Sequence, residues 1–191
     1  MAQDVRVRYT RRVIQEAFVE LLREMPLNKV TVKEICRRGE INRATFYRHY
    51  ADPYDLMDKI EEGLLEQLED YVEQSVVDGF QKTMEGMLRQ VVKNGGVYQV
   101  IASANGDPRF SQRLSELCWR QLSGQTAARF PGLSAVQQRW LYEFLAQGCG
   151  GILRNWMAGG MAEPPEETAA FLGRLTEQVE FAAGRLQTDG K

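Results

Sequence analysis

Apolar residues recur at intervals of three and four along almost the whole chain, and this periodicity constrains the fold more than any other feature. Segments near residues 14–22, 57–72 and 171–186 each place apolar side chains on one face of a helix. Alternation with a period of two, which marks a half-buried strand, does not occur. The sequence therefore predicts an all-α fold of about nine helices.

Two short helices follow the first one, and each has its own start signal. Thr31 is an N-cap residue for a helix over residues 32–38, and Glu34 three positions later completes a capping box. Asn42 caps a second short helix from residue 43 to about residue 49. Two short helices that are joined by a tight turn and preceded by a longer helix form the helix-turn-helix arrangement of DNA-binding proteins.

Gly39 and Glu40 make up the turn between the two short helices. Such a turn needs one residue with positive φ, and glycine adopts that conformation without steric cost. We therefore predict that Gly39, and not Glu40, holds the left-handed conformation.

Residues 53–191 are predicted to form a helical body, which follows the head at residues 1–52. Asp52 and Pro53 provide an N-cap and a first-turn proline for a long helix that runs to about Val77. The other body helices are expected near residues 80–93, after Gly95-Gly96, from Asp107-Pro108, from a capping box at Ser134 and Gln137, and near residues 166–187.

Charge is distributed unevenly, although the net charge of the whole chain is only −2. Residues 1–50 contain 11 Lys and Arg against 6 Asp and Glu, whereas residues 51–191 contain 13 against 20. A basic head attracts a phosphate backbone, and an acidic body is repelled by it. Chance clustering of solvated charges is the alternative interpretation of this one signal.

Composition disfavours several other classes of protein. The chain is 43% hydrophobic and 26% charged, which is ordinary for a soluble globular protein. No apolar run approaches the ~20 residues of a membrane span, and the N-terminus has no apolar signal core, so we expect a cytoplasmic protein. The three cysteines are far apart and His49 is the only histidine, so we expect neither a disulfide framework nor a metal site. The rival class is a small helical enzyme or a ligand carrier. Because the sequence offers no plausible catalytic triad, metal cluster or phosphate loop, we expect that the protein is not an enzyme and has no cofactor.

The second short helix has the side chains of a DNA-recognition helix, with Phe46 turned inward toward Ile35 and Ile41. Arginine pairs with guanine edges in the major groove. Tyrosine and histidine suit phosphate contacts, which fix the register without reading the bases. The capped start of the preceding helix can present backbone N–H groups to a phosphate. The residues predicted to bind DNA are Thr31, Lys33, Asn42, Arg43, Thr45, Tyr47, Arg48 and His49.

The segment Thr-Val-Lys-Glu-Ile-Cys-Arg-Arg-Gly-Glu-Ile-Asn-Arg-Ala-Thr-Phe-Tyr-Arg-His-Tyr at residues 31–50, with Asp-Pro-Tyr-Asp-Leu at 52–56, resembles the helix-turn-helix signature of the TetR/AcrR family. Residues 148–161 and 165–167 resemble the C-terminal domain of a subgroup that includes dihydroxyacetone-kinase-operon regulators. The resemblance implies an all-helical homodimer that regulates transcription on double-stranded operator DNA, commonly as a repressor released by a small effector. It also implies DNA contacts at Lys33, Arg43, Thr45, Tyr47 and His49.

Two departures from the family pattern affect this interpretation. The family usually has glycine where this chain has Glu40, and alanine where it has Gly39. The lysine that starts the fourth helix in the family is Pro53 here, which removes one common phosphate contact, and the neighbouring Asp52 would repel DNA. The basic residues of the N-terminal arm that can compensate are Arg6, Arg8, Arg11 and Arg12.

Methionine and aromatic side chains of the body can enclose an apolar pocket for a small-molecule effector, although such residues at helical spacing more often form plain core. The predicted lining residues are Met84, Met87, Tyr98, Trp119, Phe144 and Trp156. An effector-blind regulator that responds to a protein partner is the alternative.

The two C-terminal helices, near residues 136–158 and 166–187, are the predicted homodimer interface. Gly148, Gly150 and Gly151 each cost ~1 kcal/mol inside a helix relative to alanine. Close helix approach across a dimer interface is the first explanation of these glycines, and a ligand recess is the alternative. The apolar stripes predicted to meet the partner consist of Leu141, Leu145, Ile152, Phe171, Leu175 and Val179.

Overall fold

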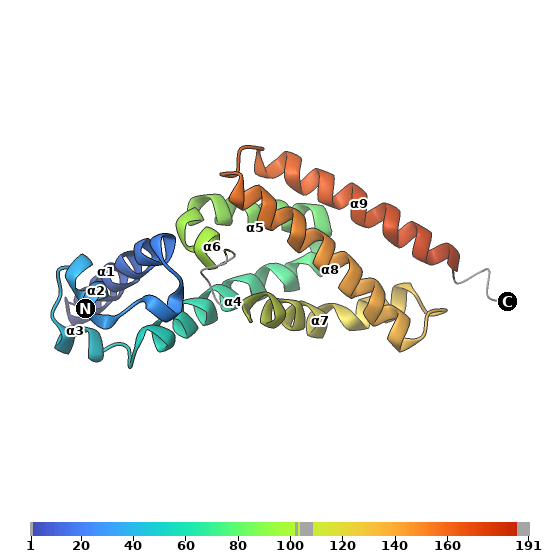
Figure 1. The fold of residues 1–191 in the computed structure, drawn as a ribbon. Coiled ribbons are helices and arrows are strands. Elements are labelled where there is room, and N and C mark those ends of the chain that lie inside the picture. The colour runs from blue at the N-terminus through green and yellow to red at the C-terminus, as the bar shows by residue number, and fades with distance from the viewer. Residues whose placement is uncertain (1, 102, 104–108, 187–191) are drawn as a thin grey trace. The chain divides into compact units, whose positions relative to one another are not determined.

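The computed structural model describes residues 2–101, 103 and 109–186, and these residues form nine α-helices, one 3-10 turn and no strand (Figure 1). This confirms the predicted all-α fold. The chain divides into two compact units, the first made of residues 1–64 with 96–110 and the second of residues 65–95 with 111–191.

The first unit contains the N-terminal helices. Their bounds are α1 (Ala2–Glu24), the 3-10 turn (Leu27–Lys29), α2 (Val32–Arg38), α3 (Arg43–Tyr47), the start of α4 (Pro53–Asp78) and α6 (Gly95–Ile101). The apolar faces of these helices meet in a core in which each large side chain contributes about 1.5–3 kcal/mol by burial. The most deeply buried members are Ile14, Phe18, Leu21, Leu22, Ile35, Phe46, Leu56 and Met57.

The turn between α2 and α3 is built differently from the prediction. Glu40 has a φ of 49° and Gly39 a φ of −83°, so the prediction that Gly39 holds the left-handed conformation is wrong. The cause is the way α2 ends. The backbone N–H of Ile41 donates to the carbonyl of Cys36 at 3.0 Å. This is the longer hydrogen bond of a Schellman motif, which places the residue just after the helix cap, here Glu40, in the left-handed conformation.

Gly39 instead lies where α1 approaches α2 closely. A Cβ at this position would lie 3.3 Å from Cγ1 of Val13, 3.3 Å from the carbonyl oxygen of Ile35 and 3.5 Å from Cβ of Ala17. Gly39 therefore allows α2 to pack directly on α1, and the turn conformation falls on the residue that follows.

The second unit contains the body helices α5 (Phe80–Lys93), α7 (Phe110–Arg129), α8 (Ala135–Ala158) and α9 (Pro165–Leu186). Helix α9 lies beside both α5 and α8 (Figure 1). The capping box predicted at Ser134 and Gln137 is confirmed at the start of α8. The helix start predicted at Asp107-Pro108 lies outside the described residues.

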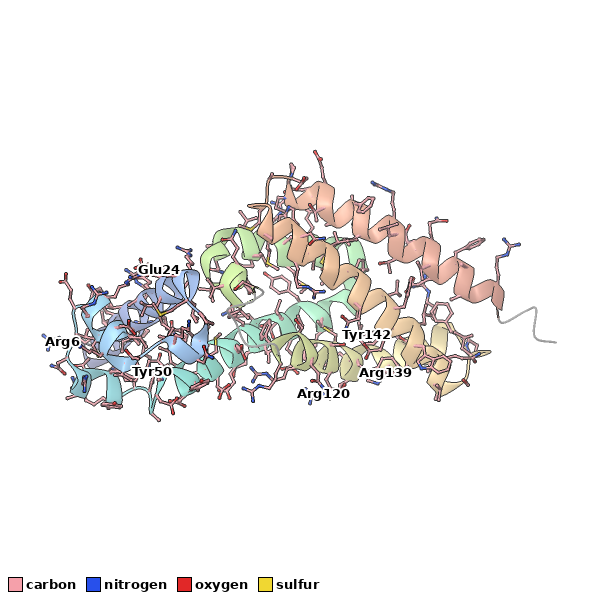
Figure 2. The ribbon with its side chains drawn as sticks, viewed as in Figure 1. Arg6, Glu24, Tyr50, Arg120, Arg139 and Tyr142 are labelled. Atoms are coloured by element: carbon pink, nitrogen blue, oxygen red, sulfur yellow. The ribbon has the colours of Figure 1, made fainter. Side chains whose placement is uncertain are left out.

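A cluster around Arg139 joins α7 to α8 (Figure 2). The Arg139 guanidinium lies 5.0 Å from the ring centroid of Trp119 and 5.6 Å from that of Tyr142, and it pairs with Glu116 at 3.1 Å. The Tyr142 hydroxyl donates to the Ser115 carbonyl at 2.6 Å, and burial raises the pKa of Tyr142 to about 12. Cation–π contacts and ion pairs thus hold the two helices together here.

Candidate nucleic-acid interface

Thr31 holds the start of α2. Its hydroxyl oxygen accepts a hydrogen bond from the backbone N–H of Glu34 at 3.3 Å, which confirms the predicted N-cap. The Glu34 carboxylate accepts a hydrogen bond from the Thr31 hydroxyl at 2.7 Å, and not from the Thr31 backbone N–H as in a capping box, so the prediction that Glu34 completes a capping box is wrong. Thr31 and Lys33 are both exposed at this end of α2.

Asn42 holds the start of α3. Its side-chain oxygen accepts the backbone N–H of Thr45 at 2.7 Å, so the predicted N-cap is confirmed. Because this oxygen serves the cap, the side-chain amide hydrogens are the groups of Asn42 suited to contact DNA. The helix ends at Tyr47, two residues earlier than predicted, with Arg48 as its C-cap.

Phe46 fixes which face of α3 points outward. It has no exposed surface, whereas Arg43 is exposed and Tyr47 is 57% exposed. Thr45 is half-buried, and its hydroxyl oxygen accepts a hydrogen bond from Nη2 of Arg48 at 2.9 Å. Arg43 and Tyr47 are therefore the members of α3 that are best placed to reach a ligand.

His49 lies half-buried just after α3. Burial lowers the pKa of His49, and the positive charges of Arg11 and Arg48 lower it further. The imidazole is therefore neutral near pH 7, and it would meet a phosphate through an N–H group without a full positive charge.

The N-terminal arm is part of a helix, because α1 begins at Ala2. Its four arginines, Arg6, Arg8, Arg11 and Arg12, are exposed along this helix. Arg12 pairs with Glu16 at 3.3 Å. Arg6, Arg8 and Arg11 can thus contribute positive charge from the same unit that contains α2 and α3.

Arg38 does not point outward with Arg43 and Tyr47, because its side chain binds α1. Its guanidinium donates to both carboxylate oxygens of Glu24, at 2.6 and 3.1 Å, and this contact lowers the pKa of Glu24. The bidentate pair holds the end of α2 against the end of α1.

Asp52 is the N-cap of α4. Its carboxylate accepts the backbone N–H groups of Tyr54 at 2.7 Å and of Asp55 at 2.9 Å, which confirms the predicted cap. Two donors that could have met a phosphate are therefore already bound within the chain.

Asp55 and Lys59 of α4 contact the chain just after α3, and neither residue was among the predicted site residues. Lys59 donates to the backbone carbonyl of His49 at 3.2 Å and pairs with Asp55 at 2.9 Å. The spacing of four residues on one helix was the signal available in the sequence.

In the body, a recess of about 650 Å³ lies between the end of α8 and the start of α9. Of the six predicted effector-lining residues, Trp156 is among the residues that line it. Met84 is buried, and Met87 and Trp119 are half-buried. Phe144 is 66% exposed, and Tyr98 is buried within the first unit.

Two further properties concern only the described part of the chain. No three His, Cys, Asp or Glu residues there form a group that could hold a metal ion. None of the helices in that part has the length and apolar character needed to cross a membrane.

Residues 78–178 match a protein family described as "Transcriptional regulator C-terminal region". A 55-residue stretch is 42% identical to YxbF, an uncharacterized HTH-type transcriptional regulator of Bacillus subtilis (strain 168). That alignment covers 28% of this chain and 14% of the relative, so the chain spans only a small part of that relative's length. The matched family and this relative are both described as transcriptional regulators.

Solved structures share the fold. A TetR transcriptional regulator from Streptococcus agalactiae 2603V has a TM-score of 0.66 at 21% identity, over 92% of this chain and 98% of that one. The dihydroxyacetone kinase operon activator DhaS has a TM-score of 0.62 at 20% identity, over 90% and 97% of the two chains. The fatty acid degradation regulator FadR from Bacillus halodurans has a TM-score of 0.63 at 11% identity, over 87% and 94%.

Proposed function

Because the chain belongs to the TetR family of DNA-binding transcriptional regulators, we propose that it acts as a homodimeric repressor that binds operator DNA through α2 and α3. Helix α3 carries the proposal. Asn42 caps its start, the buried Phe46 fixes its rotation, and Arg43 and Tyr47 are left on its outer face. A helix held in this way can enter the major groove with its polar side forward.

Arg43 and Tyr47 have different roles in this proposal. Arg43 reads a base edge from the start of the recognition helix, and Tyr47 holds a phosphate. Arg43→Ala should therefore reduce the preference for operator over scrambled DNA by ~1–3 kcal/mol. Tyr47→Phe should weaken binding to both duplexes by the same factor, since a phosphate contact carries no sequence information.

The test begins by footprinting the purified protein on the DNA upstream of its own gene, which gives an operator duplex. Fluorescence anisotropy then measures the affinity of each variant for this duplex and for a scrambled one at fixed salt concentration. Equal losses on the two duplexes for Arg43→Ala contradict the proposed role of that residue.

Dimerisation is proposed through an apolar face of α8 and α9. Val136, Trp140 and Phe144 are 57%, 67% and 66% exposed and follow one another at intervals of four residues on α8. On α9, Phe171 and Leu175 are 49% and 42% exposed. Large apolar side chains on neighbouring helices support an isologous interface with a second copy, arranged as a four-helix bundle.

The glycines of α8 support the same interface. A Cβ at Gly148 would meet no heavy atom within 4 Å, and Cβ atoms at Gly150 and Gly151 would meet only the side chain of Arg154. No contact within the described chain therefore explains why α8 bears the destabilising cost of these glycines. Close approach of a partner helix provides a reason.

The exposed apolar face of α8 and α9 differs partly from the interface predicted from the sequence. Four of the predicted interface residues are half-buried within one subunit: Leu141, Leu145, Ile152 and Val179. The sharper test is therefore Trp140→Glu combined with Leu175→Glu. Sedimentation should show a monomer, and operator binding should be lost, because one head offers too little contact on its own. Val92→Glu, at another apolar residue that is 45% exposed, is the matched control and should stay dimeric. A double variant that remains a dimer and binds its operator overturns this interface.

Release by a small-molecule effector that binds the body completes the proposal. The effector must bind the DNA-incompetent state more tightly than the DNA-bound state. Melting the protein against a metabolite library should identify a compound that raises the melting temperature and also weakens operator binding. If every stabilising compound leaves operator binding unchanged, the alternative of a protein partner replaces this part of the proposal.

A further inference from the structure

The ion pair between Asp55 and Lys59 binds the backbone of the segment between α3 and α4 at two points. The Asp55 carboxylate accepts the backbone N–H of Ala51 at 2.8 Å. The Lys59 ammonium donates to the backbone carbonyl of His49 at 3.2 Å. The same oxygen of Asp55 pairs with Lys59 at 2.9 Å. The two side chains therefore bracket Tyr50 by binding the peptide groups before and after it.

Tyr50, labelled in Figure 2, extends this arrangement to the other helices of the first unit. It is 4% exposed, and its ring centroid lies 5.3 Å from Lys59 Nζ and 5.8 Å from the centroid of Phe46. Its hydroxyl accepts a hydrogen bond from Nε2 of Gln15 at 3.4 Å. Residues of α1, α3 and α4 thus meet at one buried ring.

Helix α3 needs such support because it has only five residues. A helix of this length is not stable alone in water, so tertiary contacts set its position. Asn42 fixes its start and Phe46 its middle, and the bracket formed by Asp55 and Lys59 fixes its exit.

We propose that the Asp55–Lys59 ion pair is a positioning device, which sets the orientation of α3 and so determines how strongly the protein prefers its operator over other DNA. The inference rests on the proposed function, in which α3 reads bases. Neither residue has to touch DNA for the device to work. A base contact depends on placement to within about 0.5 Å, whereas a general attraction to phosphates does not.

Asp55→Ala separates this proposal from simple electrostatics, because the two predict opposite results. Removing a negative charge from a DNA-binding unit should tighten binding to every duplex if only charge matters. If Asp55 positions α3, the variant should bind its operator about tenfold more weakly, on the order of one lost base contact, without loss of affinity for scrambled DNA. Glu62→Ala is the matched control, since it removes the same charge from an exposed site on α4 and should leave the preference unchanged.

Substitutions of Lys59 provide a second test of the proposal. Lys59→Met should reduce the operator preference as Asp55→Ala does, and Lys59→Arg should retain most of it because the cation is kept. Equal weakening on both duplexes by Lys59→Met, with a shallower salt dependence, would identify Lys59 as a phosphate contact and overturn the positioning role. All measurements are made well below the melting temperature of each variant, with circular dichroism confirming the helical fold.

The same assay distinguishes the failure of the two proposals. A wild-type protein with no preference for its footprinted duplex refutes the proposed function itself. A preference that Arg43→Ala abolishes but Asp55→Ala leaves intact refutes only the positioning device.

Discussion

The turn between α2 and α3 offers a perturbation whose size follows from one backbone angle. Glu40 adopts a φ of 49°, which costs a residue with a Cβ ~1–2 kcal/mol. Glycine does not bear this cost, but it adds ~0.4–1 kcal/mol of conformational entropy to the unfolded chain. Glu40→Gly should therefore stabilise the protein by about 0.5–1 kcal/mol.

Gly39→Ala is the paired change, and it should act in the opposite direction. The added methyl group would lie 3.3 Å from both Val13 and the Ile35 carbonyl, where α1 and α2 are already in contact. Overpacking of this kind costs ~1–3 kcal/mol, whereas alanine at a φ of −83° gains ~0.4–1 kcal/mol from the lower entropy of the unfolded chain, so the net loss should be about 1 kcal/mol. Two neighbouring residues in one turn should thus respond with opposite signs.

Urea and thermal unfolding followed by circular dichroism at one protein concentration measure both effects. For a chain of this size, 1 kcal/mol corresponds to about 2–4 °C in melting temperature. A lower urea midpoint for Glu40→Gly, or a higher one for Gly39→Ala, would refute the assignment of conformation to one residue and packing to the other.

Three further outcomes are expected. Because the pKa of His49 is lowered in the free protein, the folded state loses stability as pH falls below about 6.5. A phosphate beside the imidazole would raise the pKa of His49 again. Operator affinity should therefore rise between pH 7.5 and 6 in the wild type and stay constant in His49→Gln. Arg139→Met should lower the free energy of unfolding, measured by urea denaturation, by about 1 kcal/mol through the lost cation–π contact, and a double-mutant cycle with Trp119→Leu should show coupling between the two residues. Burial raises the pKa of Cys118 to about 11, so this thiol should react with an aromatic disulfide reagent far more slowly in native than in urea-unfolded protein, as measured by mass spectrometry of the labelled peptide.

Local chemistry made much of the fold predictable from the sequence. Thr31, Asn42, Asp52 and Ser134 each cap the helix expected of them, because an N-cap needs only one side-chain oxygen and the N–H groups two or three residues later. The inward position of Phe46 follows equally from helical spacing.

The errors arose where distant segments decide the outcome. At Gly39 the local rule for turns was wrong, because α2 ends in a Schellman motif that gives the positive φ to Glu40, while a Cβ at Gly39 would lie against Val13 and Ala17 of α1. The spacing of Asp55 and Lys59 could have predicted their ion pair, but not the contacts of the pair with the backbone on both sides of Tyr50. In α8, periodicity alone could not decide which apolar stripe faces its own subunit and which, with Trp140 and Phe144, faces outward.

The capped start of α4 has a consequence for the ionic atmosphere of the operator. Each DNA phosphate that a protein neutralises releases condensed counterions, and it steepens the plot of log affinity against log salt by about 0.9. The Asp52 carboxylate accepts the N–H groups of Tyr54 and Asp55, and Pro53 stands where the helix-turn-helix signature that this chain resembles has a lysine. If two such heads bind an operator as proposed, the dimer should release about two fewer counterions than a dimer with a lysine at this position. It should hold its DNA across a wider range of cellular salt concentration than a relative with lysine at this position.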